Sequence, residues 1–284
     1  MVVADLYRQM VVLLRSVFTD NVEFEVECLI KHYFKINSAG FTKQLRMEIS
    51  YSQYQSCLAL AKRRMAHEPL DYIIGNSEFM GRLYDVGSGV LIPRSETELL
   101  VQEAQCVIPQ FFSSAFMGIE FGFGSGIISI ELALTFSDST WLSFDISDEP
   151  VKFATKNAQR YDITSIDWKH MDFFESKSLW QDSDQLLFLV ANPPYIPTKD
   201  LNLLHKSVKD HEPLIALDGG ESGLVIYQNM FSLCQDNEFL ICLECGINQS
   251  DNIINFASEF GFRCLNKVFD YQQIPRVLTF TNQI

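Results

Sequence analysis

Residues 117–136 read MGIEFGFGSGIISIELALTF and contain a strand pattern, a glycine-rich turn and a helix pattern in succession. Residues 117–121 form a short apolar run typical of a buried strand, and residues 127–136 carry the longer apolar pattern of a helix. Residues 122–126 place glycine at every second position, and glycine lets the backbone adopt positive φ and approach a ligand closely. A glycine-rich turn that follows a strand and opens a helix is typical of a nucleotide site.

The same alternation of short apolar runs and helical patterns continues to the end of the chain. The predicted strands cover residues 117–121, 140–144, 166–170, 186–191, 239–244, 262–266 and 276–281. The predicted helices cover residues 127–136, 147–161, 223–234 and 248–260. Strand–helix alternation predicts a parallel sheet with helices on both faces. We therefore predict an α/β fold with a Rossmann-like, mostly parallel sheet of seven strands.

Residues 1–72 show a different pattern and predict a small all-α N-terminal domain. Val3, Leu6 and Met10 recur at helical spacing, and two further helical patterns follow before Pro69. Proline ends the last of them because it has no N–H and cannot continue a helix. This segment carries no chemical motif, so we expect it to bind the substrate rather than to react with it.

Residues 73–95 differ again and predict a β-hairpin linker. Apolar pairs alternate with turn residues as they do in hairpin strands, and residues 90–92 predict one more short strand. Ser95 and Glu98 fit the S-x-x-E capping box, with Ser95 as the cap of a helix. The α/β domain is then expected over residues 96–284.

Polar and aromatic residues follow consecutive predicted strands. Asp145 ends the second strand, about 20 residues after the glycines, where a carboxylate accepts hydrogen bonds from ribose hydroxyls. Asp172 and Phe173 follow the third strand, and Phe173 provides a face on which adenine can stack. Because the carboxyl ends of parallel strands meet at one edge of a sheet, these residues predict a single nucleotide-binding site.

The fourth strand runs into Asn192-Pro193-Pro194-Tyr195. Two consecutive prolines have fixed φ and no N–H, so the backbone after Asn192 is stiff and extended. The Asn192 amide, the freed carbonyl groups and the Tyr195 ring are the parts needed to hold a planar amide or amine. Alone, this stretch would indicate a proline-rich loop that ends a strand. The glycine turn upstream makes the ligand site the better interpretation.

Composition narrows the classes of protein that this chain can be. The net charge of −14 argues against binding to nucleic acid through its phosphates. No apolar run approaches the roughly 20 residues that span a bilayer, and the N-terminus lacks the basic region of a signal peptide. The seven scattered cysteines suit a reducing compartment, and Cys242 and Cys245 should face opposite sides of one strand. We expect a cytoplasmic protein without a metal site.

The glycine turn and the N-P-P-Y stretch together resemble class I S-adenosylmethionine-dependent methyltransferases of the N-P-P-Y branch. Three further stretches, residues 69–75, residues 90–98 and residues 212–217, are similar to the release-factor glutamine methyltransferase family. The helical N-terminal domain also fits that family, so the resemblance covers nearly the whole chain.

The resemblance implies methylation of the glutamine in the Gly-Gly-Gln motif of class I peptide-chain release factors, with S-adenosylmethionine as the methyl donor. It makes residues 96–284 the methyltransferase domain and release factors the protein partners of a monomer. The predicted donor-binding residues are Glu120, Gly122, Phe123, Gly124, Ser125, Gly126, Asp145, Asp172, Phe173 and Asn192. The predicted catalytic residues are Asn192, Pro193 and Tyr195, and the predicted substrate-binding residues are Asn192, Pro193, Pro194 and Tyr195.

The chain departs from the family pattern in a few places: Glu120 replaces an aspartate, Phe123 a small polar residue and Ser95 a proline, His211 replaces an aromatic residue, and Gln272-Gln273 stands in a stretch without the family's glycine.

Two alternatives stay open. An adenine-amine methyltransferase for DNA or RNA would use the same N-P-P-Y stretch, but it should carry a basic face. A non-catalytic binding module would have no need of Asn192, Tyr195 and Asp145 together.

Overall fold

The computed structural model describes residues 1–37, 40–183 and 186–283, and the chain forms two compact units. The first unit consists of Met1–Asn76 and His205–His211, and the second of Ser77–Leu204 and Glu212–Ile284. The sequence pattern does not indicate that residues 205–211 join the helical unit. The domain bounds 1–72, 73–95 and 96–284 stay predictions.

The first unit is helical. Its helices are α1 (Val3–Arg15), α2 (Val22–Phe34), α3 (Phe41–Gln44), α4 (Tyr51–Met65), α5 (Leu70–Ile74) and α9 (Lys206–Lys209). Val3, Leu6 and Met10 of the predicted apolar stripe of α1 are fully buried and pack with the apolar faces of α2 and α4. The prediction of a hairpin strand at residues 73–74 is wrong, because these residues belong to α5. Gly75 ends this helix with φ of 84°, a conformation that favours glycine.

The predicted hairpin consists of β1 (Asn76–Phe79) and β2 (Arg82–Asp85). Residues 90–92 form no strand, and Ile92 N–H donates to Glu212 Oε2 at 3.2 Å instead of to a sheet neighbour. The predicted capping box is also wrong. Helix α6 (Ser95–Phe111) has Arg94 as its N-cap, and the Glu98 side chain accepts the Met80 N–H from the hairpin.

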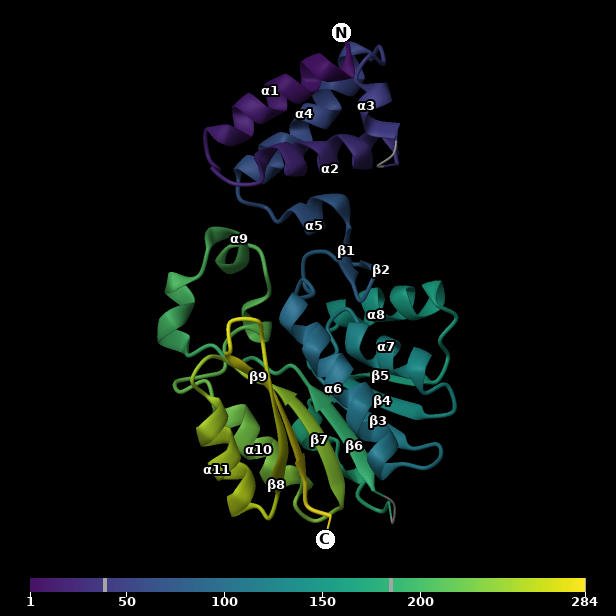
Figure 1. Ribbon diagram of the computed structural model, residues 1–284, viewed down its shortest axis with the longest axis vertical. Coiled ribbons are helices and arrows are strands. Elements are labelled where there is room, and N and C mark those ends of the chain that lie inside the picture. The colour runs from purple at the N-terminus through teal and green to yellow at the C-terminus, as the bar shows by residue number, and fades with distance from the viewer. Residues whose placement is uncertain (38–39, 184–185, 284) are drawn as a thin grey trace. The chain divides into compact units, whose positions relative to one another are not determined.

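The second unit is built on one sheet of seven strands, as predicted (Figure 1). The strands are β3 (Met117–Phe121), β4 (Thr140–Asp145), β5 (Ile166–His170), β6 (Leu187–Ala191), β7 (Phe239–Glu244), β8 (Arg263–Phe269) and β9 (Pro275–Thr281). Within the described residues their order is β5-β4-β3-β6-β7-β9-β8, in which β9 runs antiparallel to β7 and β8 and the other pairs are parallel. The strand order reverses between β3 and β6, which is where open α/β sheets bind ligands.

Helices cover both faces of this sheet. Helices α6, α7 (Ile127–Thr135) and α8 (Glu149–Arg160) pack on one face, and α10 (Val225–Cys234) and α11 (Ser250–Glu259) pack on the other (Figure 1). Alternate residues of β6 enter the two apolar clusters, so this strand is buried on both faces as its apolar run predicts. Cys242 and Cys245 also lie in different clusters, which confirms that they face opposite sides.

Short 3₁₀ helices occur in the loops that follow β5 and β6, and the sequence patterns predicted none of them. They are η2 (Phe173–Glu175), η3 (Lys177–Leu179), η4 (Thr198–Leu203) and η5 (Leu214–Ala216). Within the described ranges, no helix combines the length and the apolar character needed to cross a membrane.

Candidate active site

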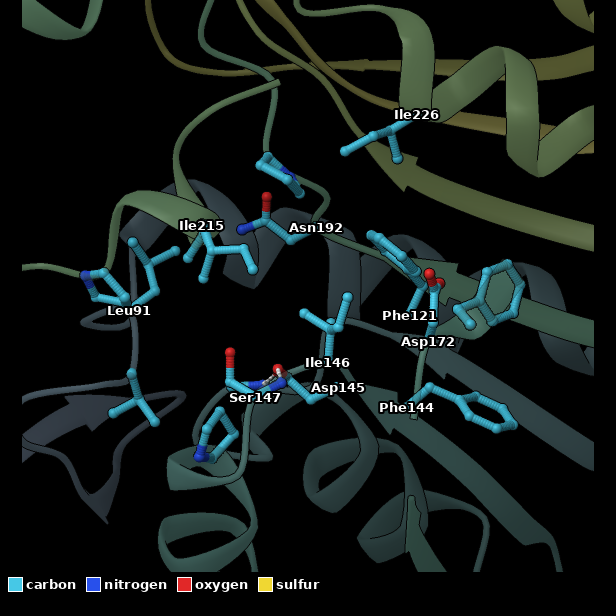
Figure 2. A pocket seen from close by; sticks show the side chains of 18 of the residues that line it. Leu91, Phe121, Phe144, Asp145, Ile146, Ser147, Asp172, Asn192, Ile215 and Ile226 are labelled. Atoms are coloured by element: carbon cyan, nitrogen blue, oxygen red, sulfur yellow. Dashed lines mark hydrogen bonds between the residues drawn. The ribbon is translucent and has the colours of Figure 1, made fainter. Parts of the chain in front are cut away.

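A cavity of about 260 Å³ lies at the carboxyl ends of β3, β4 and β6. Figure 2 shows Asn192 on one wall and Asp145 and Ser147 on the opposite wall. The lining residues are Gly89, Val90, Leu91, Phe121, Gly122, Gly124, Phe144, Asp145, Ile146, Ser147, Pro150, Met171, Asp172, Phe173, Phe174, Asn192, Pro194, Pro213, Ile215, Ala216, Asp218 and Ile226. The cavity therefore occupies the position that the strand order favours for a ligand.

The glycine turn between β3 and α7 forms part of this wall. Gly122 and Gly124 have φ of 72° and 50°, and a Cβ on either residue would meet no atom within 4 Å. Backbone conformation, and not crowding within the protein, is what requires glycine at these two positions. The space in front of their backbone is open for a ligand.

Asp145 at the end of β4 is held by the glycine turn itself. One carboxylate oxygen accepts the Gly124 N–H at 3.0 Å, and the other accepts the Ser147 N–H at 3.0 Å. Burial raises the pKa of this carboxyl group, while the two N–H donors act in the opposite direction. Each carboxylate oxygen keeps further lone pairs, so the group can still accept hydrogen bonds from a ligand.

Aromatic rings form the wall beside the carboxyl end of β5. The Phe173 ring lies 5.4 Å from that of Phe121 and 5.8 Å from that of Phe144, between ring centroids. Asp172 caps η2 by accepting the Phe174 N–H at 2.9 Å. An apolar slot next to a fixed carboxylate can hold a flat ring that carries polar edges.

The N-P-P-Y stretch contributes unequally to the cavity. Asn192 and Pro194 line it, whereas Pro193 is buried and Tyr195 is not on the wall. The Tyr195 hydroxyl donates to Glu244 Oε1 at 3.4 Å, and the Tyr195 carbonyl accepts from Gln249 Nε2 at 2.8 Å. These contacts hold the end of the stretch against the carboxyl end of β7.

Asn192 is held from the other side by helix α6. Its Nδ2 donates to Thr97 Oγ1 at 3.0 Å, and Thr97 Oγ1 donates to Glu244 Oε2 at 2.7 Å. The side chains of Thr97 and Glu244 are both buried. Burial raises the pKa of Glu244 to about 7. One buried carboxylate thus connects to both ends of the N-P-P-Y stretch.

The structure brings seven of the predicted site residues to the cavity wall: Gly122, Gly124, Asp145, Asp172, Phe173, Asn192 and Pro194. It does not place Glu120, Phe123, Ser125, Gly126, Pro193 or Tyr195 there.

Each of the off-wall residues in the glycine motif faces the protein interior. Glu120 is fully buried in β3, where it accepts a hydrogen bond from the Ser129 hydroxyl, and burial raises its pKa to about 8. The Phe123 ring packs on Trp168 at 4.9 Å between centroids. The glycine motif of the sequence therefore contains both residues that line the cavity and residues that pack in the core.

Sequence reasoning missed the parts of the wall that come from loops. Leu91 lies in residues 90–98, and Ile215 and Ala216 lie in residues 212–217. Both stretches resemble the release-factor glutamine methyltransferase family, but no site role was predicted for these three residues. Glu212 explains part of their placement, because its carboxylate accepts from Ile92 N–H and from Arg94 Nη2 at 2.6 Å. This pairing joins the two loops on one side of the cavity.

Comparison with known proteins supports the resemblance to release-factor glutamine methyltransferases. The PrmC N-terminal domain family matches residues 5–75. The release factor glutamine methyltransferase of Geobacter sulfurreducens is 31% identical over 265 residues, which cover 91% of this chain and 89% of that protein. The protein of the same name from Bacillus anthracis is 32% identical over 257 residues, covering 89% of this chain and 90% of that protein.

Among solved structures, the hMettl16 catalytic domain in complex with MAT2A 3′UTR hairpin 6 superposes with a TM-score of 0.53 and 14% identity, covering 83% of each chain. At this identity the likeness shows the fold alone, which is that of a methyltransferase. The two relatives above 30% identity extend over nearly the whole of both chains, and they confirm the resemblance inferred from the motifs. The chain therefore belongs to the release factor glutamine methyltransferase family.

Proposed function

We propose that this enzyme transfers a methyl group from S-adenosylmethionine to the side-chain amide nitrogen of the glutamine in the Gly-Gly-Gln motif of class I peptide-chain release factors. Family membership gives the reaction class, which is methylation of a protein glutamine. The observation that carries the proposal is the position of Asn192. It follows β6, lines the cavity, and faces Asp145 across it (Figure 2).

The cavity walls fit the methyl donor, which consists of an adenine, a ribose and a methionine joined at a sulfonium. The ring slot around Phe173 suits the adenine, and Asp145 can accept hydrogen bonds from the ribose hydroxyls. The open backbone at Gly122 and Gly124 allows the methionine part to approach closely. Asp172 on the same wall can accept hydrogen bonds from the adenine or ribose. When bound, the donor supplies a methyl group on a positively charged sulfur.

An amide nitrogen is a weak nucleophile because its lone pair is delocalised into the carbonyl group. Asn192 Oδ1 can accept a hydrogen bond from one amide N–H of the substrate, and the Pro193 carbonyl can accept from the other. Acceptors that hold both N–H groups favour the more pyramidal nitrogen of the transition state. The nitrogen gains a methyl group and loses one proton, so acceptors on its N–H groups also suit the direction of proton loss.

Tyr195 contributes to this site by shaping the loop. Its hydroxyl and carbonyl contacts to Glu244 and Gln249 hold the backbone that carries the Pro193 carbonyl. Because Tyr195 does not line the cavity, its proposed role is to hold the backbone of the N-P-P-Y stretch in place beside the glutamine side chain.

We propose that the helical N-terminal domain binds the release factor. The PrmC N-terminal domain family matches this domain, and the domain carries no chemical motif. A monomer in the cytoplasm is proposed as the working form. Neither a metal nor a covalent intermediate is needed by this reaction, because a sulfonium is a good leaving group.

The second candidate is methylation of an adenine amine in DNA or RNA, which the N-P-P-Y stretch alone would also serve. A net charge of −14 disfavours it, because such an enzyme has to neutralise phosphates. The experiment incubates the protein with labelled S-adenosylmethionine and a release factor, beside the same factor with its motif glutamine replaced by alanine. We expect one methyl group on the wild-type glutamine by mass spectrometry. Label in added DNA or RNA, with none in the release factor, would favour the second candidate.

A further inference from the structure

The two ends of an asparagine side chain differ in chemistry although they are similar in shape. Oδ1 only accepts hydrogen bonds and Nδ2 only donates them. If Asn192 is to hold a substrate N–H, as the proposed function requires, Oδ1 has to face the cavity. A rotation of the amide by half a turn would present a donor to the reacting nitrogen. The site therefore needs a group that distinguishes the two ends.

Helix α6 and strand β7 supply such a group. Thr97, the third residue of α6, lies 95 positions before Asn192, and its Oγ1 accepts the Asn192 Nδ2 hydrogen bond at 3.0 Å. The same oxygen donates to Glu244 Oε2 at 2.7 Å, at the end of β7. A hydroxyl has one hydrogen, and a carboxylate can only accept. Because that hydrogen is directed to Glu244, Oγ1 has only lone pairs left for Asn192.

This order of donors fixes the direction of the Asn192 amide. With Nδ2 toward Thr97, both hydrogen bonds are satisfied. With Oδ1 toward Thr97, two oxygen lone pairs would meet and a buried hydrogen bond would be lost. The loss of such a bond disfavours the reversed amide by a factor of roughly 5 to 150, so the amide keeps one orientation about 85% of the time or more.

Burial keeps water from replacing either bond. Thr97 and Glu244 are each 1% exposed. The Glu244 backbone is also fixed, because its carbonyl accepts the Tyr227 hydroxyl at 2.8 Å and Tyr227 is itself buried. Glu244 Oε1 accepts the Tyr195 hydroxyl, so the same carboxylate holds the far end of the N-P-P-Y stretch.

We propose that Thr97 and Glu244 are positioning residues, which orient the Asn192 amide so that Oδ1 faces the substrate nitrogen. Neither residue touches the reacting atoms. They act through the direction of one hydrogen-bond chain, Asn192 to Thr97 to Glu244. The effect on the methyl-transfer rate rests on the proposed function, whereas the orientation of the Asn192 amide can be measured independently of activity.

The test compares four single substitutions in the full-length protein. Thr97→Val removes the hydroxyl and keeps the shape, and Thr97→Ser keeps the hydroxyl. Glu244→Gln keeps the shape but allows an N–H to donate to Thr97, which releases the hydroxyl hydrogen. Thr279→Val is the matched control, because Thr279 is a fully buried threonine of β9 whose hydroxyl donates to Glu103 Oε1 at 2.8 Å.

The first readout is the single-turnover rate of methyl transfer to a release factor at saturating donor. We expect Thr97→Val and Glu244→Gln to lower this rate about 10- to 100-fold, as the loss of an oriented catalytic hydrogen bond does. Thr97→Ser should stay within about threefold of wild type, and Thr279→Val should lower thermal stability without lowering the rate. Donor affinity by calorimetry, and release-factor affinity in the presence of S-adenosylhomocysteine, should change by less than about threefold in all four.

The second readout is the side-chain NH₂ pair of Asn192 in a ¹⁵N spectrum, identified by its loss in Asn192→Ala. In wild type and in Thr97→Ser, one proton of this pair should be protected from exchange with water, because it lies in the bond to Thr97. Thr97→Val should lose that protection. If the wild-type protein methylates no release factor, the proposed function fails, yet this spectrum still tests the orientation.

Three results would overturn the proposal. One is a Thr97→Val enzyme with a wild-type rate. Another is an equal loss of rate in Thr97→Ser and Thr97→Val when both remain folded. The third is an unprotected Asn192 NH₂ pair in the wild-type protein. If Thr97→Val does not fold, Glu244→Gln and the wild-type spectrum decide the question.

Discussion

The backbone N–H of Gly124 donates to the Asp145 carboxylate at 3.0 Å, which joins the glycine turn after β3 to the carboxyl end of the neighbouring strand β4. The positive φ of Gly124 lets its N–H point toward that strand. The carboxylate is thus oriented before any ligand arrives. Preorganisation of this kind lowers the cost of binding, because no group has to be ordered afterwards.

The first prediction concerns donor binding. Asp145→Ala removes the carboxylate that is proposed to accept the ribose hydroxyls. The loss of charged hydrogen bonds should weaken S-adenosylmethionine binding by roughly 1.5–3 kcal/mol, or about 10- to 150-fold. Calorimetry measures it, and Asp167→Ala, which removes a half-exposed aspartate of β5, is the control. An Asp145→Ala protein with donor affinity within threefold of wild type would contradict the proposed ribose site.

The second prediction concerns chemistry. Asn192→Ala removes the side-chain acceptor proposed for the substrate N–H. Single-turnover methyl transfer at saturating donor should fall about 10²- to 10³-fold, with donor affinity changed by less than about threefold. The exposed Asn252 of α11 provides a control in Asn252→Ala, which should leave the rate unchanged. The role of Asn192 would be refuted by a variant that reacts at close to the wild-type rate.

The third prediction concerns the pH dependence of the rate. Burial and the nearby Glu96 raise the pKa of Glu244 to about 7, while hydrogen bonds from Thr97 and Tyr195 and the charge of Arg276 act to lower it. A protonated Glu244 can donate to Thr97, which frees the Thr97 hydrogen and weakens the preference for one Asn192 orientation. The methyl-transfer rate should therefore fall as the pH drops below about 7.

Single-turnover rates between pH 6 and pH 8.5 measure this effect in wild type and in Glu244→Gln. The methyl-transfer rate of Glu244→Gln should be lower than that of wild type, but it should not fall further as the pH decreases, because residue 244 then has no carboxyl group to titrate. If the rate falls with decreasing pH in the same way in both proteins, a group other than Glu244 is titrating.

The fourth prediction concerns stability. Burial raises the pKa of Glu120 from 4.5 to about 8. The folded protein therefore holds this proton more tightly than the unfolded chain does, so its stabilising contribution is complete below pH 4.5 and is lost as pH rises through about 8. Between these values, Glu120 should lower the free energy of unfolding by at most about 1.4 kcal/mol per pH unit.

Urea unfolding at pH 5, 6, 7 and 8 tests the sign of this slope. The three tryptophans, Trp141, Trp168 and Trp180, all belong to the second unit, so their fluorescence reports on the unit that contains Glu120. Glu120→Gln should reduce the pH dependence relative to wild type. A variant with an unchanged slope would show that Glu120 is not the titrating group.

The sequence by itself determined the seven strands of the large sheet, the residues that follow them and the glycine turn, because each depends on local properties. Apolar periodicity identifies buried strands such as residues 187–191. The ring of proline fixes its φ, and glycine tolerates the positive φ that the turn requires. Hence Gly122, Asp145 and Asn192 were predicted at the carboxyl edge and line the cavity there. Family membership followed from the same motifs together with the stretches that flank them.

Local patterns were insufficient where two signals compete. Residues 73–74 looked like strand residues, but they lie in a helix that begins after Pro69 and ends at Gly75. Ser95 and Glu98 have the spacing of a capping box, yet Glu98 accepts a hydrogen bond from the hairpin instead. In each case the packing of the surrounding chain decided the outcome, since a short element gains more from tertiary contacts than from its own propensity.

Only the tertiary structure decided which side chains meet. Phe123 and Glu120 belong to the glycine motif in the sequence, but both are buried, Glu120 within β3 and Phe123 against the Trp168 ring. Thr97, Asn192 and Glu244 come from three distant parts of the chain and form one hydrogen-bond chain. No periodicity in the sequence predicts this contact, because it arises from the packing of α6 against β7 and from the parallel pairing of β6 with β7.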